Sequence, residues 1–182
     1  MFRSCMIALC LLLPGGMAMA QPATLPNQAV STLNLERYSG QWHEIAHLPM
    51  FFQRKCVANI TATYTLRDDG QVDVRNACDQ ADGERIVSQG RARRVPDQPG
   101  QLEVRFAPAW LSWLPMTWAD YWVIEIDPDY QWAVVGGPSR DYLWVLSRTP
   151  QMARADFEAI RQRAAQRGYP VARLVLPRDV LR

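Results

Sequence analysis

Hydrophobic and polar residues alternate along much of this chain, in short runs separated by turn-forming residues. Residues 102–106, for example, read Leu-Glu-Val-Arg-Phe, so that three apolar side chains alternate with two charged ones. A period of two is typical of a strand that buries one of its faces. Runs of this kind, together with β-rich runs bounded by turns, predict eight strands: Gln41–Leu48, Cys56–Arg67, Gln71–Cys78, Arg85–Arg94, Leu102–Phe106, Tyr121–Ile126, Gln131–Val135 and Tyr142–Ser147.

The pattern changes to a helical period after the eighth strand. Thr149 and Pro150 predict the N-cap and the first residue of a helix, and Gly168 and Pro170 predict its end. Apolar residues at helical spacing give this helix one hydrophobic face: Met152, Phe157, Ile160 and Ala164. A last short strand is predicted over Val171–Leu176.

Eight consecutive strands with short links and one final helix predict an all-β fold. We expect an antiparallel up-and-down barrel with the helix packed outside, because closure removes exposed strand edges. A barrel of eight strands is just wide enough to hold one small ligand. A sandwich of two sheets is the alternative that the same pattern leaves open.

The first twenty residues have the pattern of an export signal. Arg3 precedes the apolar run Met6–Leu13, which is too short to cross a bilayer, and Ala18-Met19-Ala20 is a cleavage motif. We therefore expect a signal peptide over residues 1–20, a flexible lead-in over 21–33 and one domain over 34–182. An N-terminal core helix is the alternative. A lipid anchor at Cys10 is not expected, because the residue before Cys10 is not small.

Composition narrows the choice of function and compartment. The chain has 48% hydrophobic and 21% charged residues, which is typical of a globular protein, and its 20 basic residues nearly balance 18 acidic ones. We therefore expect no nucleic-acid partner. Cys56 and Cys78 are the cysteines left after removal of the signal, and we expect them to form a disulfide near the mouth of the barrel, with two free thiols as the alternative.

Residues 43–47 read His-Glu-Ile-Ala-His, which is the zinc-protease motif H-E-x-x-H. That motif needs both histidines on one face of a helix, but this run is predicted as a strand. Residues four apart on a strand lie about 13 Å from each other, far beyond Zn–N bonds of about 2.1 Å. A zinc metalloprotease is therefore a distant alternative, and we expect no metal, no cofactor and no catalytic residue.

Three segments of the sequence resemble, in order, the three signatures of the lipocalin family. The residues that carry the resemblance are Gly40 and Trp42 in the first, Asp129 and Tyr130 in the second, and Arg148 in the third. The sequence of residues 62–70 is similar to that of proteins in the bacterial lipocalin (Blc) branch, which is related to apolipoprotein D. The resemblance implies a lipocalin barrel whose closed end is plugged by Trp42, with Arg148 packed across it by a cation–π contact.

The resemblance also implies a binding cavity, and strand parity assigns its lining. If Arg148 defines the inward face of the last strand, Trp144 and Tyr142 also point inward. The predicted ligand-binding residues are Ala62, Tyr64, Val74, Asn76, Val104, Phe106, Val123, Glu125, Tyr142 and Trp144. Glu44 shares the face of Trp42, so we expect Glu44 or Glu125, together with Asn76, to meet the polar head of a ligand. A barrel filled by its own side chains is the alternative.

Aromatic residues in the predicted loops, together with the family resemblance, suggest where the protein acts. Met50, Phe51, Phe52, Trp110 and Trp113 are expected at the barrel mouth, as an entrance for acyl chains, as a membrane contact, or as a loop covering its own cluster. The resemblance implies a fatty acid or lysophospholipid ligand, stored or transported in the bacterial envelope. We expect a periplasmic protein that can contact the outer membrane, and a homodimer is left open. A secreted barrel that binds a partner and no small ligand is the second alternative.

Overall fold

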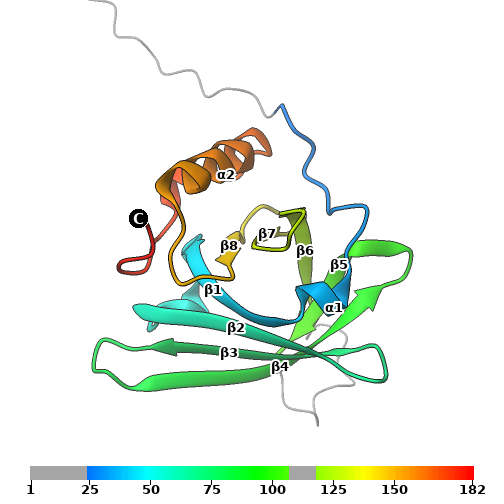
Figure 1. Cartoon of the computed structure of the whole chain (residues 1–182), viewed down its shortest axis with the longest axis horizontal. Coiled ribbons are helices and arrows are strands. Elements are labelled where there is room, and N and C mark those ends of the chain that lie inside the picture. Colours follow the sequence, from blue (N-terminus) through cyan, green and yellow to red (C-terminus); the bar gives the residue numbers. More distant parts are fainter. Residues whose placement is uncertain (1–23, 107–117) are drawn as a thin grey trace, which may run out of the picture.

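Figure 1 shows the computed structural model, which describes residues 24–106 and 118–182. Eight antiparallel strands pair in sequence order and form a closed barrel, because β1 pairs with β8 as well as with β2. The strands are β1 (Gly40–His47), β2 (Ala58–Leu66), β3 (Val72–Asp79), β4 (Arg85–Val95), β5 (Gln98–Arg105), β6 (Ala119–Ile126), β7 (Trp132–Gly136) and β8 (Trp144–Ser147). The predicted barrel is confirmed, and the sandwich is excluded.

In the described residues, four short or medium helices accompany the barrel. They are α1 (Leu35–Tyr38), the 3-10 turn η1 (Phe51–Gln53), α2 (Arg154–Gln166) and the 3-10 turn η4 (Val171–Arg173). Within the described ranges, no helix is long and apolar enough to cross a membrane. The predicted signal peptide, Trp110 and Trp113 lie outside the described residues.

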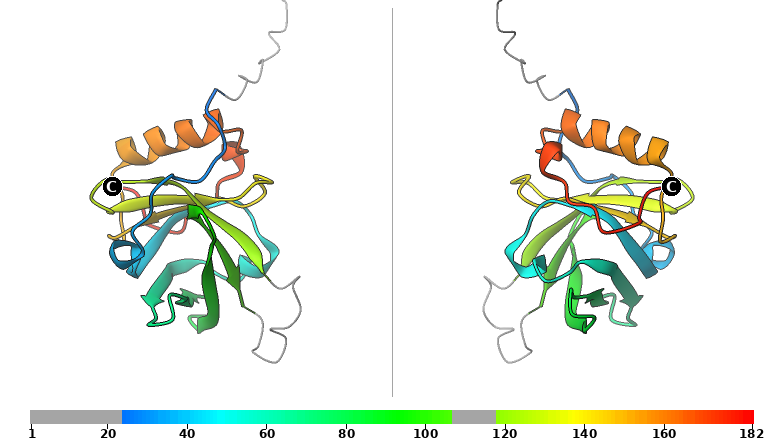
Figure 2. Two further views of the ribbon diagram at one scale, coloured as in Figure 1. Left: turned by 90° about the vertical axis from the view of Figure 1, so that its right-hand side faces the viewer. Right: turned by 90° about the vertical axis from the view of Figure 1, so that its left-hand side faces the viewer.

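The wall of the barrel separates two hydrophobic cores. Alternate strand residues fill the interior, and the opposite faces of β1, β6, β7 and β8 form an outer core with α2. The helix contributes Phe157, Ile160 and Ala164, all nearly inaccessible to solvent, as its apolar face predicted. Figures 1 and 2 show α2 lying along the outside of the barrel.

One end of the barrel is closed by α1 and by an arginine that covers a tryptophan. Trp42 is fully buried, and the Arg148 guanidinium carbon lies 3.7 Å from the centre of its ring, which confirms the predicted contact. Gly40 has φ +96°, a conformation that favours glycine, and a Cβ there would lie 3.3 Å from Arg148. The guanidinium also donates to the backbone carbonyls of Arg37, Tyr38, Gln41 and Tyr130.

The turn between β6 and β7 completes this closed end. The Asp127 carboxylate accepts from the backbone N–H groups of Asp129 and Gln131, at 3.1 and 3.0 Å. Tyr130 takes a positive φ of 58°, and its hydroxyl accepts from the backbone N–H of Asn34 at 2.9 Å. The turn therefore joins the strands to the segment that leads into α1.

Irregular pairing in two strands changes which side chains face the interior. In β1 the register shifts between Glu44 and Ala46, so that both Glu44 and His47 face the interior. In β6 the register shifts between Val123 and Glu125. An extra residue in one strand reverses the side of the sheet on which the following side chains lie.

Three local predictions were wrong. The helix begins at Arg154 rather than at Pro150, and no side chain caps it, because Ala153 is extended and Met152 forms a bridge to Leu181. The predicted strand 171–176 is instead η4 followed by a single bridge to His47. Residues 24–33 pack against the barrel instead of forming a flexible lead-in, since the backbone N–H of Val30 donates to the Val123 carbonyl.

Candidate functional site

The predicted lining residues fall into a closed half and an open half of the interior. Tyr64, Val74 and Val123 are buried in the inner core near the closed end, and Ala62 and Val104 pack against it. Asn76 pairs with Ala62 across β2 and β3, one step nearer the mouth than Tyr64. Trp144 lies at the start of β8 beside the end of β1, and Tyr142 and Phe106 lie at the rim, 40% and 42% exposed.

A cluster of three tyrosines fills the closed half. The Tyr121 hydroxyl lies 2.7 Å from that of Tyr38 and 2.8 Å from that of Tyr64, and we call these residues the tyrosine triad. Burial raises the pKa of Tyr64 to about 12 and raises those of Tyr38 and Tyr121 well above their ordinary value. The cavity beside the triad has a volume of about 10 Å³. That is room for about one water molecule and not for an acyl chain.

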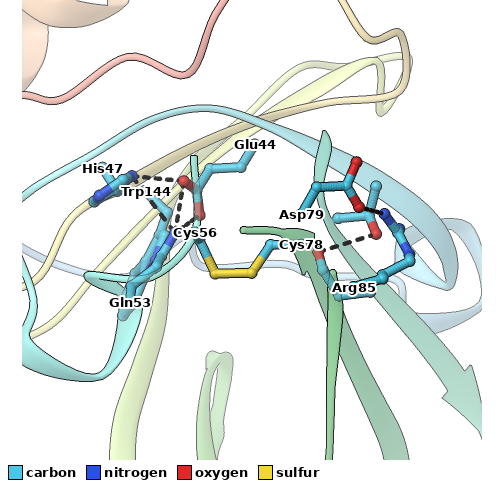
Figure 3. Close-up of a disulfide and its surroundings, with 10 residues drawn as sticks. Glu44, His47, Gln53, Cys56, Cys78, Asp79, Arg85 and Trp144 are labelled. Carbon is cyan, nitrogen blue, oxygen red and sulfur yellow. Dashed lines mark hydrogen bonds and ion pairs between the residues drawn. A yellow bond between two sulfur atoms is a disulfide. The ribbon is translucent and has the colours of Figure 1, made fainter. Parts of the chain in front are cut away.

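The open half contains a buried group of polar side chains, which we call the polar corner: Glu44, His47 and Gln53. The His47 Nδ1–H donates to Glu44 Oε1 at 2.6 Å, and the Gln53 amide donates to both carboxylate oxygens at 2.7 Å. Glu44 and His47 are each only 6% exposed. Figure 3 shows these side chains converging beside Trp144, whose indole N–H donates to Gln53 Oε1 at 3.4 Å.

The disulfide holds the segment that supplies Gln53. Cys56 and Cys78 are bonded with their Cα atoms 5.4 Å apart, which confirms the predicted pairing. Figure 3 shows the bond between the polar corner on one side and the ion pair of Asp79 with Arg85 on the other. The loop between β1 and β2 is thereby linked covalently to the end of β3.

Asn76 places an unsatisfied hydrogen-bond acceptor in the barrel interior, one step nearer the mouth than Tyr64. Its Oδ1 atom is buried and has no hydrogen-bond partner in the described part of the chain. Buried polar atoms usually have partners, so an unsatisfied one inside a barrel indicates a bound water or ligand group. The neighbour of Asn76 across the strand pair is the small residue Ala62.

The predicted inward position of Glu125 is wrong. Because of the irregularity in β6, its carboxylate lies on the outer face and pairs with two arginines of the helical segment, Arg163 and Arg167. The Arg167 contact measures 3.0 Å. Glu125 therefore holds the helix against the barrel and does not line the interior.

Exposed rings stand around the mouth. Phe51 and Phe52 are 73% and 57% exposed, and the Phe52 ring lies 6.3 Å from that of Tyr142; we call these three residues the aromatic rim. Tyr142 in turn stacks on Trp144, with ring centres 6.0 Å apart. Met50, which was also expected at the mouth, is buried instead.

The ring of Phe106, at the rim, lies against Gly90 of β4. Any Cβ on Gly90 would lie 2.8 Å from this ring and 2.5 Å from a backbone oxygen, so only glycine lets the ring lie there. The glycine therefore makes room for one of the predicted lining residues.

The H-E-x-x-H motif does not form a metal site. His43 and His47 lie on a strand, and the shift in β1 turns His47 into the barrel to meet Glu44, while the ring of His43 lies 3.3 Å from the Gln41 amide. Among the residues that the structure describes, no three His, Cys, Asp or Glu side chains are grouped to hold a metal ion.

Sequence reasoning missed Gln53 and the contact that His47 makes. Gln53 lies in a predicted loop, and its only signal is its closeness to Cys56, which suggests a tethered segment. His47 should have faced outward by simple alternation from Trp42, and only the irregular pairing near Ala46 turns it inward. Neither effect follows from residue periodicity.

Comparisons with known proteins agree with this geometry. The family described as a lipocalin-like domain matches residues 33–179. Temperature-induced lipocalin-1 of Arabidopsis thaliana is 42% identical over 150 residues, covering 81% of this chain and 80% of that protein. Outer membrane lipoprotein Blc of Vibrio cholerae is 32% identical over 176 residues, covering 95% and 96%. The structure of insecticyanin from the tobacco hornworm Manduca sexta covers 86% of this chain and 87% of its own, with 17% identity and a TM-score of 0.63.

Proposed function

Since the chain belongs to the lipocalin family, we propose that it binds a fatty acid or lysophospholipid in the open half of its barrel. It stores or transports this lipid in the bacterial envelope and catalyses no reaction. The observation that carries the proposal is the apolar inner wall, where Trp144 and Ala62 pack against the inner core and the Phe106 ring lies over Gly90. Apolar walls with few polar groups are typical of small-molecule sites.

The filled closed half limits where the lipid can lie. The tyrosine triad and Trp42 occupy the bottom of the barrel, so the acyl chain has to bind above them. The polar corner is at the level of the mouth, where it can meet the polar end of a bound lipid. A single chain suits this space better than a two-chain phospholipid.

We place the protein in the periplasm, in contact with the outer membrane. The name of the Vibrio cholerae relative, an outer membrane lipoprotein, supports the envelope. Phe51 and Phe52 are exposed at the mouth, and exposed Arg54 and Lys55 follow them directly. Aromatic rings enter the interface of a bilayer, while basic side chains attract anionic lipids. This contact does not require a lipid anchor.

Lipid titration of two matched tryptophan variants tests the binding site. Dodecanoate or a lysophospholipid should quench the intrinsic fluorescence saturably, and Trp144→Phe should lose much of this quenching. Trp132→Phe is the control, because Trp132 packs in the outer core, and it should keep the quenching. Absence of saturable binding by either lipid would favour a barrel that binds a partner instead.

Vesicle sedimentation tests the membrane contact separately. The double variant Phe51→Ser/Phe52→Ser should bind less to vesicles containing phosphatidylglycerol. The control is Val175→Ser/Leu176→Ser, which removes two apolar side chains that are also exposed but belong to the segment bridged to His47 rather than to the aromatic rim. Equal losses in the two variants would mean that no particular surface faces the membrane.

A further inference from the structure

The polar corner has more acceptors than donors. Glu44 receives hydrogen bonds from His47 and Gln53, yet no Lys or Arg side chain pairs with it in the described part of the molecule, where His47 is its ion-pair partner. Its Oε2 atom receives only the Gln53 amide, which it shares with Oε1. A carboxylate oxygen accepts more than one bond, so this oxygen can receive another donor.

Asn76 adds a second acceptor from the neighbouring wall. Its buried Oδ1 has no donor in the described residues, and one small residue, Ala62, lies between Asn76 and β1 in the strand register. A group that carries several N–H bonds can satisfy both acceptors. A carboxylate head can satisfy neither, because it offers acceptors only.

Charge and aromatic rings favour the same kind of group. Burial raises the pKa of Tyr64, and the charge of Glu44 adds to this rise, so Glu44 makes the interior favourable for a cation. Trp144 stacks with Tyr142 at the mouth, and Phe52 lies beside them. Aromatic faces beside a carboxylate are the surroundings in which proteins bind ammonium groups.

We propose that the polar corner selects single-chain amphiphiles that carry an ammonium headgroup. The ammonium pairs with Glu44, donates to Asn76 and lies against the ring of Trp144, while the acyl chain occupies the apolar wall. This inference rests on the proposed function and deepens it, because it ranks headgroups within one binding site. A lipid whose only charge is a carboxylate binds less tightly, because Glu44 repels it.

Three twelve-carbon probes that differ only in headgroup test the selection: dodecylamine, dodecanol and dodecanoate. They are titrated near neutral pH, below their micelle concentrations, with calorimetry and tryptophan fluorescence as readouts. Dodecylammonium should bind most tightly and dodecanoate most weakly. In Glu44→Gln the affinity for dodecylammonium should fall by about tenfold, the usual size of a lost bond to a charged group, and that for dodecanoate should rise.

Two further variants distinguish a change in headgroup selection from a loss of folding. Glu103→Gln removes a carboxylate that pairs with Arg93 on the outside of the barrel, and it should leave the order of the probes unchanged. Asn76→Ala should weaken dodecylammonium but not dodecyltrimethylammonium, which has no N–H to donate. Thermal unfolding of each variant confirms that the barrel is intact.

The outcomes separate this inference from the proposed function. If none of the probes binds the wild-type protein, the proposed function fails and the inference fails with it. If dodecanoate binds as tightly as dodecylammonium, or if Glu44→Gln leaves the order unchanged, lipid binding stands and the ammonium selection is overturned.

Discussion

The two ends of the barrel are built on opposite principles. At the closed end the buried polar groups bond to one another: Arg148 covers Trp42 and donates to four backbone carbonyls, and the hydroxyls of the tyrosine triad bond to each other. At the open end the aromatic rim is exposed, and the Asn76 oxygen has no partner in the described residues. Unsatisfied groups and exposed rings are costly for stability, so their concentration at one end indicates binding there.

This contrast predicts two classes of substitution. Changes at the closed end should lower the free energy of unfolding and leave the affinity of the folded protein for lipid unchanged. Changes at the open end should alter lipid or membrane binding with little effect on stability. The disulfide is the feature that crosses this division, because it stabilises the end that binds.

The largest expected effect is at Trp42. Trp42→Ala should lower the free energy of unfolding by about 3–5 kcal/mol, because it empties a fully buried site and removes the ring under Arg148. Denaturant unfolding measures this change. Phe51→Ala, which truncates a ring that is 73% exposed, should cost less than about 0.5 kcal/mol. Equal losses at the two sites would remove the distinction between the ends.

The disulfide should have the next largest effect. Replacing both Cys56 and Cys78 by serine should lower the free energy of unfolding by about 3 kcal/mol, because the bond closes a loop with a sequence separation of 22 residues. Lipid affinity should fall as well, since the loop that positions Gln53 loses its tether. Reductant should destabilise the wild-type protein in denaturant unfolding but leave the double serine variant unchanged. No loss of affinity in that variant would show that Gln53 is held without the bond.

Alkaline pH should weaken the closed end through the tyrosine triad. Tyr64 has a folded-state pKa of about 12, and an unfolded tyrosine titrates near pH 10. Its contribution is therefore fully present below pH ~10 and is lost as the pH rises toward ~12, by about 2–3 kcal/mol for this residue. Tyr64→Phe should flatten that part of the stability profile in denaturant unfolding. A profile as steep as that of the wild type would mean that other groups control alkaline unfolding.

The barrel was predictable because it depends on averages over many residues. The alternation in residues 102–106 predicts a closed sheet, and so does the order of the signatures that contain Trp42 and Arg148. A wrong assignment at one residue therefore does not change the predicted fold. The disulfide was predictable for a different reason, since two cysteines in a chain that begins with the pattern of an export signal have few other roles.

The site was harder to predict because single irregularities decide which way a side chain points. The register shift in β1 turns His47 inward, and the register shift in β6 turns Glu125 outward. Neither shift follows from the pattern of hydrophobic and polar residues. Gln53 faces the interior because η1 and Cys56 hold its loop, which is a tertiary effect. Thr149 looked like an N-cap, but its hydroxyl donates to the Gln151 carbonyl, and the helix begins only at Arg154. Periodicity alone therefore identified residues that pack in or against the inner core, such as Tyr64, Val74 and Val123, but it placed the polar groups only in part.

Glu125 gives the smallest effect and the sharpest test of the corrected site. Glu125→Gln should lower the free energy of unfolding by about 1 kcal/mol, because the partly buried carboxylate loses its charge opposite Arg163 and Arg167 while the amide keeps some of the bonds. Glu158→Gln, in an exposed pair with Arg161, should cost less than about 0.5 kcal/mol in the same unfolding experiment.

Lipid affinity then distinguishes the inward position that the sequence predicted for Glu125 from the outward position that it has in the structure. On the outer face its carboxylate cannot touch a ligand in the barrel, so the affinities of Glu125→Gln for dodecylammonium and dodecanoate should equal those of the wild type. Inside the barrel the same substitution would shift both affinities, as Glu44→Gln should. Any shift at Glu125 would therefore mean that the strand pairing of β6 rearranges when lipid binds, and the open half would extend further down the barrel than its unliganded geometry shows.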